Sequence, residues 1–325
     1  MNTGKFPEIS YKRAVLKKMS SITQNMKPGV EAATIKLEDV TMVMSSNCIL
    51  EWFSGCEGFY LQKTINALME QGGVPKGIQL EWNLPEKYDE RNLGKKMSKF
   101  NLEAKQRNLP ILQCRVYKGK TTDAILNLTV IGISKRQFSL KAIQPGMDIV
   151  MAGTVGCGAT AVLSSIYETE LREKFPATFV RECQEFWKML SIEKAVDIAM
   201  KYPLTYIHQV SDGGVFGALW ELGSGCDQGV QVDVKKIPVW QHSIEVAEFL
   251  DANPYTIEGT GAVLFVCEDG EELVQELQEN NIMSGVIGQM TDNNDRIVSN
   301  ADENRFLEPP RGDGIYELLQ KHSQK

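Results

Sequence analysis

The segment 208–215, His-Gln-Val-Ser-Asp-Gly-Gly-Val, holds the strongest local cluster of residues that could do chemistry. An apolar stretch precedes it, and the pattern of residues 215–222 predicts a helix after it. His208 could be a catalytic base or a structural histidine, and Asp212 could take part in catalysis or act as the helix N-cap. Gly213 and Gly214 would let backbone amides approach a ligand closely, and a helix N-terminus favours an anion.

Two further glycine-rich turns are weaker candidates. The segment 152–160, Ala-Gly-Thr-Val-Gly-Cys-Gly-Ala-Thr, matches neither of the common phosphate-binding fingerprints, so a tight strand-to-helix connection is favoured over a phosphate cradle. Gly259 and Gly261 could adopt positive φ beside a ligand or merely form a turn. Cys157 lies near a predicted helix start but has no histidine or lysine nearby in sequence, which favours an ordinary thiol.

Composition excludes several classes of function. The 325 residues carry a net charge of −7, which argues against nucleic-acid binding driven by basicity. No apolar run is long enough for a transmembrane helix, and the start lacks the apolar stretch of a signal peptide. The three histidines and seven cysteines show no zinc-ligand spacing, and the odd cysteine number favours reduced thiols. We therefore expect a cytoplasmic protein that binds neither membrane nor nucleic acid.

The elements that must position these residues alternate between strands and helices. In the first half, strands are predicted over 32–37, 40–44, 109–116 and 124–133, and helices over 57–71 and 89–108. The second half predicts strands and helices in alternation, with helices over 160–174, 177–189 and 191–201 among them. A polar segment ending at Pro145-Gly146 marks a boundary, which gives an N-terminal extension (1–27), a first domain (28–143) and a second domain (144–325). The fold class is α/β (α+β).

The order of these pieces resembles the superfamily of aminoimidazole ribonucleotide (AIR) synthase, and above all its hydrogenase maturation branch. The family pattern His-Asp-Val-Thr-Glu-Gly-Gly-Val is present here as residues 208–215. The segment 258–261 and the segment Arg-Phe-Leu-Glu-Pro-Pro at 305–310 also fit. The resemblance implies two α/β domains, of which the first pairs with its copy in a second subunit to close a β-barrel. It also implies ATP and Mg²⁺ in the cleft near that interface, and so a homodimer that binds a nucleotide or another small anionic ligand.

The resemblance fails where the family places acidic residues. The family loop Gly-Asp-Asp-Ala-Ala corresponds to residues 29–33, where one acid is Val30 and the other is Glu31. Other family acids correspond to Asn47, Ala67, Arg115 and Gln209. The resemblance therefore gives a candidate nucleotide or anion site made of Gly29, Glu31, Asn47, Asn66, Arg115, Gly213 and Gly214.

Glu31 is the remaining candidate metal ligand, and Mg²⁺ binding is in doubt because an arginine repels a cation. Arg115 could instead replace the charge of the metal at a phosphate. The maturation factor of the family also carries a carbamoyl group on a terminal cysteine, whereas this sequence ends Lys-His-Ser-Gln-Lys.

Two hypotheses follow. In the first, the chain is a divergent member, a pseudoenzyme that binds a nucleotide, another anion or a maturation-type protein partner without Mg²⁺-dependent phosphoryl transfer. In the second, it is an active ATP-dependent enzyme of the maturation type with rewired metal ligands, in which Glu31, His208 and Asp212 do the work.

Overall fold

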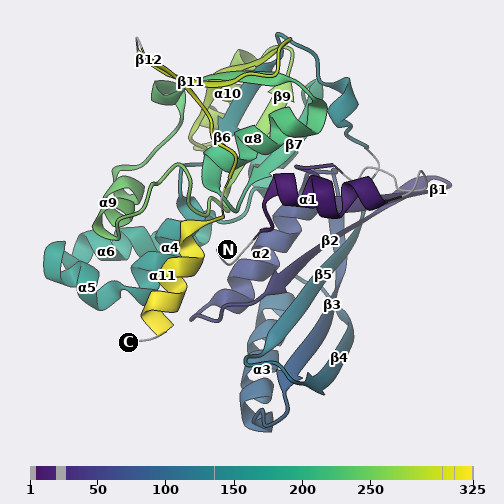
Figure 1. Cartoon of the computed structure of the whole chain (residues 1–325), viewed down its shortest axis with the longest axis vertical. Coiled ribbons are helices and arrows are strands. Elements are labelled where there is room, and N and C mark those ends of the chain that lie inside the picture. The colour runs from purple at the N-terminus through teal and green to yellow at the C-terminus, as the bar shows by residue number, and fades with distance from the viewer. Residues whose placement is uncertain (1–4, 20–26, 135, 302, 311, 324–325) are drawn as a thin grey trace. The chain divides into compact units, whose positions relative to one another are not determined.

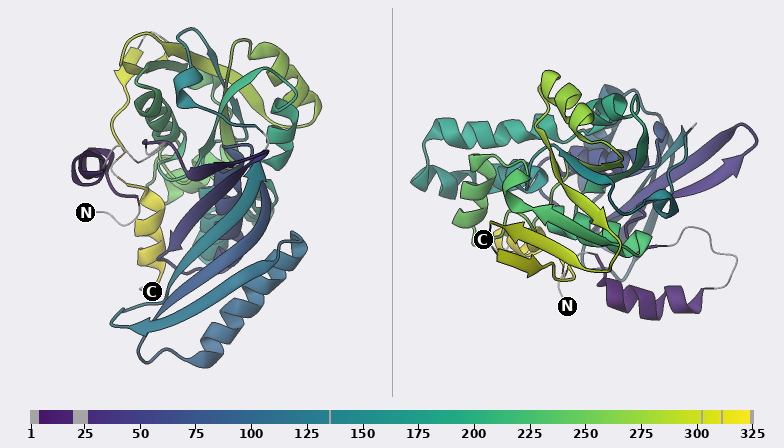
Figure 2. Two further views of the ribbon diagram at one scale, coloured as in Figure 1. Left: turned by 90° about the vertical axis from the view of Figure 1, so that its right-hand side faces the viewer. Right: turned by 90° about the horizontal axis from the view of Figure 1, so that it is seen from above.

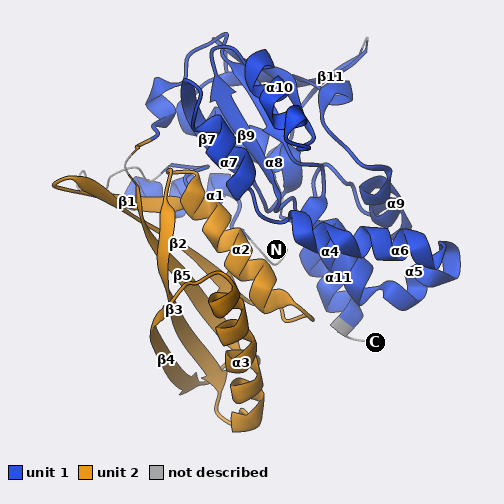
Figure 3. Ribbon diagram, turned by 180° about the vertical axis from the view of Figure 1, so that it is seen from behind, with its two compact units in different colours: residues 1–30, 138–325 blue, residues 31–137 orange. Residues whose placement is uncertain are grey.

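The computed structural model describes residues 5–19, 27–134, 136–301, 303–310 and 312–323. These residues form two compact units, which Figure 3 shows in two colours. Unit 2 is residues 31–137, and unit 1 combines residues 1–30 with 138–325. The division at 137/138 lies a few residues before the predicted boundary at 143/144. The first 30 residues group with unit 1, where the sequence suggested a separate extension up to residue 27.

Unit 2 contains a five-stranded sheet in the order β1-β2-β5-β3-β4. Its strands, labelled in Figure 1, are β1 (Ala32–Leu37), β2 (Val40–Ile49), β3 (Val74–Pro85), β4 (Ile111–Gly119) and β5 (Ile125–Ser134). Only the β3–β4 pair is parallel among the pairings of this sheet. Each strand predicted in this half of the sequence is present, and β2 runs further than expected.

Two helices cover one face of this sheet, and the left view of Figure 2 shows α3 lying along it. They are α2 (Cys56–Met69) and α3 (Glu90–Gln106), close to the predicted 57–71 and 89–108. Asp89 caps α3 by accepting a hydrogen bond from the amide of Arg91 (3.1 Å). The strands alternate: Leu126, Leu128 and Val130 of β5 are fully buried on the helix side. The opposite face therefore has no helical cover from this unit.

Unit 1 contains a seven-stranded sheet in the order β12-β11-β8-β10-β6-β9-β7. Its strands are β6 (Asp148–Ala152), β7 (Leu204–Val210), β8 (Gly229–Asp233), β9 (Ala262–Cys267), β10 (Ser284–Thr291), β11 (Arg296–Asn300) and β12 (Glu303–Phe306). The yellow strands β11 and β12 form one edge (Figure 2). Every residue of β9 is buried, which explains its continuous apolar sequence.

Two of the helices predicted in unit 1 are divided in the structure. The predicted helix over 160–174 is divided at Tyr167 into α4 (Cys157–Ile166) and α5 (Glu168–Lys174). The predicted helix over 177–189 is divided into α6 (Ala177–Gln184) and the 3₁₀ turn η3 (Glu185–Met189). The remaining helices are α1 (Glu8–Ala14), α7 (Glu193–Ala199), α8 (Gly214–Cys226), α9 (Gln241–Phe249), α10 (Glu271–Glu279) and α11 (Gly314–Ser323).

Short 3₁₀ turns complete unit 1: η1 (Leu16–Lys18), η2 (Leu140–Ala142) and η4 (Val234–Lys236). Among the described residues, no helix combines the length and apolar character that crossing a membrane would require. All seven cysteines are unpaired thiols, as the sequence indicated.

Candidate functional site

The buried histidine of unit 1 faces an acid on the next helix. His208 lies in β7 with only 1% of its surface exposed, and its Nε2 is 3.4 Å from Oε2 of Glu221 in α8. Lys5 reaches the other carboxylate oxygen of Glu221 at 2.6 Å. Burial alone would raise the pKa of Glu221, but Lys5 and His208 together lower that pKa to about 2. Glu221 is therefore ionised at neutral pH.

Gly29 lies against the same helix. Its φ of +74° is in the left-handed region, and a Cβ added to it would come within 3.0 Å of the carbonyl oxygen of Glu221. The hydroxyl of Tyr206 donates to the carbonyl of Gly29 at 3.4 Å. The structure thus brings two of the predicted site residues, Gly29 and His208, next to Glu221, a residue to which the sequence analysis gave no role.

The predicted Asp212-Gly213-Gly214 turn leads from β7 into α8. Asp212 does not cap the helix, so that alternative is wrong: the N-cap is Gly213, with no side-chain cap, and the Tyr316 hydroxyl donates to Oδ1 of Asp212 at 2.9 Å. Gly213 and Gly214 have φ of +83° and +62°. A Cβ on Gly214 would lie 2.6 Å from the carbonyl oxygen of Tyr255, so close backbone packing requires a glycine there.

An internal carboxylate occupies the start of α8. The amide of Gly213 donates to Oδ2 of Asp313 at 2.8 Å, and the amide of Ile315 donates to Oδ1 of the same residue at 2.8 Å. The amide of Gly214 donates to the carbonyl of Ser211. An external anion at Gly213, as expected from the sequence, would therefore have to displace Asp313.

Three acids converge beside this turn. One ligand atom from each of Asp212, Glu258 and Asp313 lies within 4.8 Å of the others, the one such group of three among the residues that the structure describes. Burial, followed by the charges of Glu258 and Asp212, raises the pKa of Asp313 to about 8. Such a group can hold a proton at neutral pH, which is the property a general acid needs.

Sequence reasoning missed Asp313 and treated Glu258 as part of a turn. Oε1 of Glu258 accepts hydrogen bonds from the amide and the hydroxyl of Thr260, at 2.9 and 2.7 Å. Because α11 brings Asp313 to residues a hundred positions earlier, no local spacing signals the cluster.

In unit 2, two of the predicted site residues meet at one helix. Nδ2 of Asn47 in β2 donates to Oγ1 of Thr64 at 3.0 Å, and Nε2 of Gln62 donates to Oδ1 of Asn66 at 2.9 Å. Thr64, Gln62 and Asn66 all belong to α2. Asn47 and Asn66 are therefore held at the helix-covered side of the sheet, with their amides bonded to α2.

Glu31 and Arg115 lie elsewhere in unit 2. Glu31 directly precedes β1, and its carbonyl accepts a hydrogen bond from Oγ of Ser45 at 3.3 Å. Arg115 is exposed on the edge strand β4, which is separated from β2 by the two strands β5 and β3. Its neighbour Cys114 contacts Met97 of α3, so Arg115 points to the opposite face of the sheet. Unit 2 by itself does not bring Arg115 to Asn47 and Asn66.

The glycines of the other glycine-rich turns have structural roles. A Cβ on Gly153 (φ +91°) would lie 2.5 Å from the carbonyl oxygen of Gly261. Gly261 has φ of +110°, whereas Gly259 does not adopt positive φ. Burial and the charge of Glu258 raise the pKa of Cys157 to about 12, which agrees with an ordinary thiol. These contacts favour the interpretation of 152–160 as a tight strand-to-helix connection.

Comparisons with known proteins place this geometry in context. Residues 144–299 match the family described as AIR synthase related protein, C-terminal domain. A putative hydrogenase expression/formation protein of Methanocaldococcus jannaschii is 26% identical over 266 residues, which cover 78% of this chain and 75% of that protein. Carbamoyl dehydratase HypE of Rhizobium leguminosarum is 22% identical over 217 residues, 65% of this chain and 60% of the relative.

Solved structures agree in fold. HypE in the crystal structure of a HypE–HypF complex has a TM-score of 0.72 at 18% identity, with 93% of this chain and 100% of that chain covered. HypE in complex with ATP has a TM-score of 0.65 at 17% identity, with 88% and 90% covered. ThiL of Aquifex aeolicus, solved with AMPPCP and TMP, has a TM-score of 0.70 at 15% identity, with 94% and 99% covered.

Proposed function

Because this chain is an AIR synthase-related protein that resembles the hydrogenase maturation proteins of that superfamily, we propose that it binds a nucleotide or another anionic ligand. In this proposal its metal-dependent ATP chemistry is weakened or lost. Structures of two similar proteins hold ATP or AMPPCP, which supports a nucleotide as the ligand.

The chemistry of the donor set in unit 2 carries the proposal. Magnesium prefers hard oxygen ligands, usually carboxylates. At the positions where the resemblance expects acids, this unit offers Glu31, the neutral amide of Asn47, the apolar Ala67 and a cation, Arg115. The amides of Asn47 and Asn66 are already bonded to α2. In the described part of the chain, the one group of three clustered metal-ligating side chains lies in unit 1. The residues of unit 2 at these positions do not fit a magnesium site. The proposed function therefore includes no step at a metal.

A homodimer belongs to the same proposal. The uncovered face of the sheet in unit 2 exposes Ile35 (53%), Met44 (37%) and Ile133 (37%), which face the same side by their strand register. Contiguous exposed apolar side chains of this kind are typical of an interaction surface. Arg115 points to this face as well, so in a dimer its charge can serve a ligand bound near the interface. A maturation-type protein partner fits the proposal too, since the related HypE was solved with HypF.

The alternative is an active ATP-dependent enzyme with rewired metal ligands. The cluster of Asp212, Glu258 and Asp313 favours it, because three carboxyl groups converge there. Both oxygens of Asp313 already accept hydrogen bonds from backbone amides. A metal would have to compete with these amides for the oxygens of Asp313, so we favour the first proposal.

Thermal denaturation with ATP, in the presence of either MgCl₂ or EDTA, distinguishes the two. Ligand that binds only the native state raises the melting temperature. We expect ATP to raise it equally in both conditions, with ATP hydrolysis at the level of a blank. Mg²⁺-dependent hydrolysis that Glu31→Gln abolishes, with Glu38→Gln as the matched control in the neighbouring turn, would contradict the proposal.

A further inference from the structure

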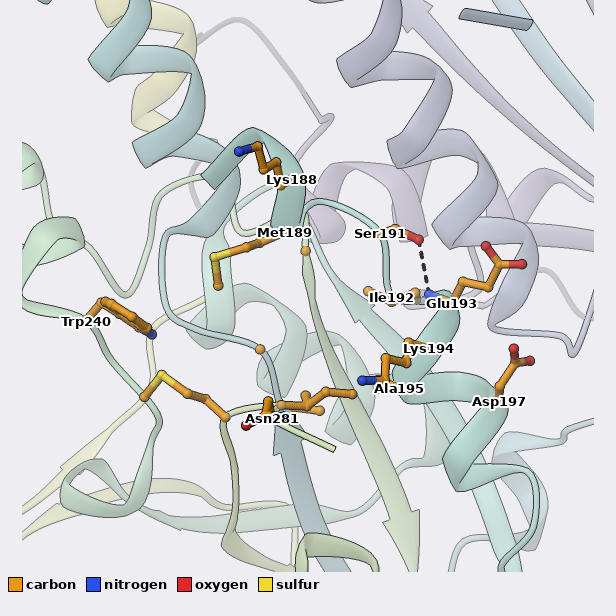
Figure 4. A pocket seen from close by; sticks show the side chains of 15 residues that line it. Lys188, Met189, Ser191, Ile192, Glu193, Lys194, Ala195, Asp197, Trp240 and Asn281 are labelled. Carbon is orange, nitrogen blue, oxygen red and sulfur yellow. Dashed lines mark hydrogen bonds between the residues drawn. The ribbon is translucent and has the colours of Figure 1, made fainter. Parts of the chain in front are cut away.

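A cavity of about 540 Å³ opens within unit 1, and none of its lining residues belongs to the proposed nucleotide or anion site. The lining comes from the end of β6, from residues of the segment 188–197, from Trp240, from Gly261 and from the loop 281–283 between α10 and β10 (Figure 4). A volume of this size lies in the range of sites that hold small molecules. The side chains that face this space therefore indicate which kind of molecule fits it.

One wall of the cavity is aromatic and apolar. Trp240 is 40% exposed, Met283 is 38% exposed, and Met189 also lines the cavity. Phe186 packs edge-on against Trp240, with the ring centroids 6.1 Å apart, and the backbone amide of Trp240 donates to Oγ1 of Thr154 at 3.2 Å. Tryptophan and methionine contact a flat aromatic ring well, through stacking and sulfur–aromatic contacts. A ring placed here would cover apolar surface that the protein leaves exposed.

The same wall offers a hydrogen-bond donor. The indole N–H of a tryptophan donates and cannot accept. Figure 4 shows the indole nitrogen of Trp240 at the end of the ring that faces the other lining residues, and in the described part of the chain no acceptor is bonded to it. A ligand that carries an acceptor is therefore favoured over one that carries only donors.

Lys194 brings a positive charge to the cavity. Figure 4 shows its side chain directed toward the space between the lining residues. Its Nζ donates to the carbonyl of Asn280 at 2.6 Å, which holds the ammonium group beside the loop 281–283. A carbonyl is neutral and takes one of the three N–H donors of a lysine, so the charge and two donors remain for a ligand. No carboxylate of the described residues forms an ion pair with Lys194.

The other charged side chains of the lining do not cancel this charge within the cavity. Glu193 and Asp197 also belong to the lining, but Figure 4 shows their carboxylates directed away from the space. Lys188 forms an ion pair with Glu185. The lining therefore holds equal numbers of acids and lysines, but their orientation presents the positive charge of Lys194 to a ligand.

The loop that carries Met283 is held by the backbone. The amide of Gly153 donates to the carbonyl of Met283 at 2.9 Å, and the amide of Ile282 donates to the carbonyl of Leu277 at 2.9 Å. Together with the bond from Lys194 to Asn280, these contacts fix the loop beside the end of β6. The cavity is therefore preformed, which lowers the entropy lost when a ligand binds.

We propose that this cavity binds a small aromatic carboxylate. The ring lies against Trp240, Met189 and Met283, and the carboxylate accepts hydrogen bonds from Nζ of Lys194. One ammonium group without a carboxylate partner matches one negative charge, which favours a carboxylate over a phosphate of charge near −2. Apolar contact supplies most of the affinity, and Lys194 supplies a modest selection for negative charge because its side chain is exposed. The site is independent of the proposed function, since its lining contains no residue of unit 2.

Isothermal titration calorimetry on the full chain with three matched probes tests the charge preference. The probes 2-naphthylacetate, 2-naphthylacetamide and 2-(2-naphthyl)ethylamine share a ring and a short arm, but they end in a carboxylate, a neutral amide and an ammonium group. We expect the amide to bind about three- to tenfold more weakly than the carboxylate, and the amine to bind at least about tenfold more weakly. Binding of the amide or the amine that equals or exceeds binding of the carboxylate would overturn the proposal, and so would a carboxylate that does not bind at millimolar concentration.

Variants locate the binding. Lys194→Met should weaken naphthylacetate about three- to tenfold and leave naphthylacetamide unchanged, whereas Lys194→Arg should retain most of the affinity for the carboxylate. Lys188→Met removes the same charge from the lining at a lysine that already has an acidic partner, so it is the matched control and should change carboxylate binding less than about twofold. Trp240→Ala should weaken the carboxylate and the amide alike, each roughly tenfold, through lost ring contact.

The two probes separate a contact between Lys194 and the ligand from a merely structural role. If Lys194→Met weakened the amide as much as the carboxylate, Lys194 would act only by holding the loop through Asn280, and the proposal would fail. It would fail as well if Lys188→Met weakened the carboxylate as much as Lys194→Met does. Carboxylate binding that survives Trp240→Ala, in protein with an unchanged melting temperature, would place the ligand elsewhere and refute the site.

Discussion

The carboxyl group of Asp313 accepts a hydrogen bond of 2.8 Å from the amide of Gly213, a hundred positions earlier in the chain. Through this contact, a side chain from the segment before α11 accepts a hydrogen bond from the backbone at the start of α8. The same carboxyl group lies close to Asp212 and Glu258. One residue thus joins the end of the chain to the turn that the sequence analysis singled out.

The buried carboxyl cluster predicts a stability that falls with rising pH. The ordinary pKa of Asp313 is 3.8, and burial with two acidic neighbours raises it to about 8 in the native protein. The native state therefore binds more protons than the unfolded state between these values, and this contribution to stability is lost as pH rises from about 4 to 8. Asp212→Asn keeps an acceptor for Tyr316 and removes one neighbouring charge, so it should recover roughly 1 kcal/mol at pH 8.5.

Melting temperatures at pH 5 and pH 8.5 measure this effect. The fall between the two pH values should be smaller in Asp212→Asn and in Glu258→Gln than in the wild type. Glu248→Gln changes an exposed acid and should reproduce the wild-type fall. If the melting temperatures of all four proteins fell equally between pH 5 and pH 8.5, the cluster would not be the source of this pH dependence.

The contacts of Glu221 with Lys5 and His208 predict the opposite pH dependence of stability. Its pKa is lowered from 4.5 to about 2, so its contribution to stability is present above about pH 4.5 and is lost as pH falls toward 2. Glu221→Gln should destabilise the protein by about 1–3 kcal/mol at pH 7, because His208 and Lys5 lose an ionised partner. Lys5→Met should cost less, about 0.2–1 kcal/mol, since the Lys5 side chain is 41% exposed. Urea denaturation at pH 7 gives both values, and a larger effect for Lys5→Met would contradict this ranking.

Local pattern predicted much of the fold. Alternation in β5 and helical spacing in α2 and α3 predicted these elements within a few residues. The strand β5 and the helix α3 each bury one face, whereas nearly every residue of α2 is buried. Segments whose pattern is interrupted were misjudged: the helix over 160–174 breaks at Tyr167, whose hydroxyl bonds to the carbonyl of Leu318. The strands β11 and β12 and the helix α11 were not foreseen.

The site was only partly predictable for the same physical reason. His208, Asp212 and the two glycines are consecutive, so sequence alone could find them. Asp313 and the role of Glu258 depend on contacts between distant segments, which spacing does not report. The placement of Arg115 opposite Asn47 depends on strand order, which the sequence does not give either.

Gly214 predicts a sharp difference between two adjacent glycines. At both positions an alanine would sit at positive φ, which costs about 1–2 kcal/mol. At Gly214 the new Cβ would also lie 2.6 Å from the carbonyl of Tyr255, whereas at Gly213 the nearest atom is at 3.4 Å. Gly214→Ala should therefore destabilise by roughly 3–5 kcal/mol and Gly213→Ala by about 1–2 kcal/mol. Gly94→Ala, in α3 with open space, is the control and should stabilise by about 0.5–1 kcal/mol.

The uncovered sheet face of unit 2 predicts self-association. If a second copy covers Ile35, Met44 and Ile133, a charge placed among them must lose its water in the dimer at a cost of several kcal/mol. Met44→Glu should therefore dissociate the dimer in sedimentation at micromolar concentration and leave the folded monomer intact, because Met44 is already exposed in the single chain. Leu102→Glu changes an apolar residue on α3 that is more exposed than Met44, and this variant should remain dimeric. A wild type that sediments as a monomer, or a Met44→Glu variant that sediments as a dimer, would show that this face is not the one that pairs.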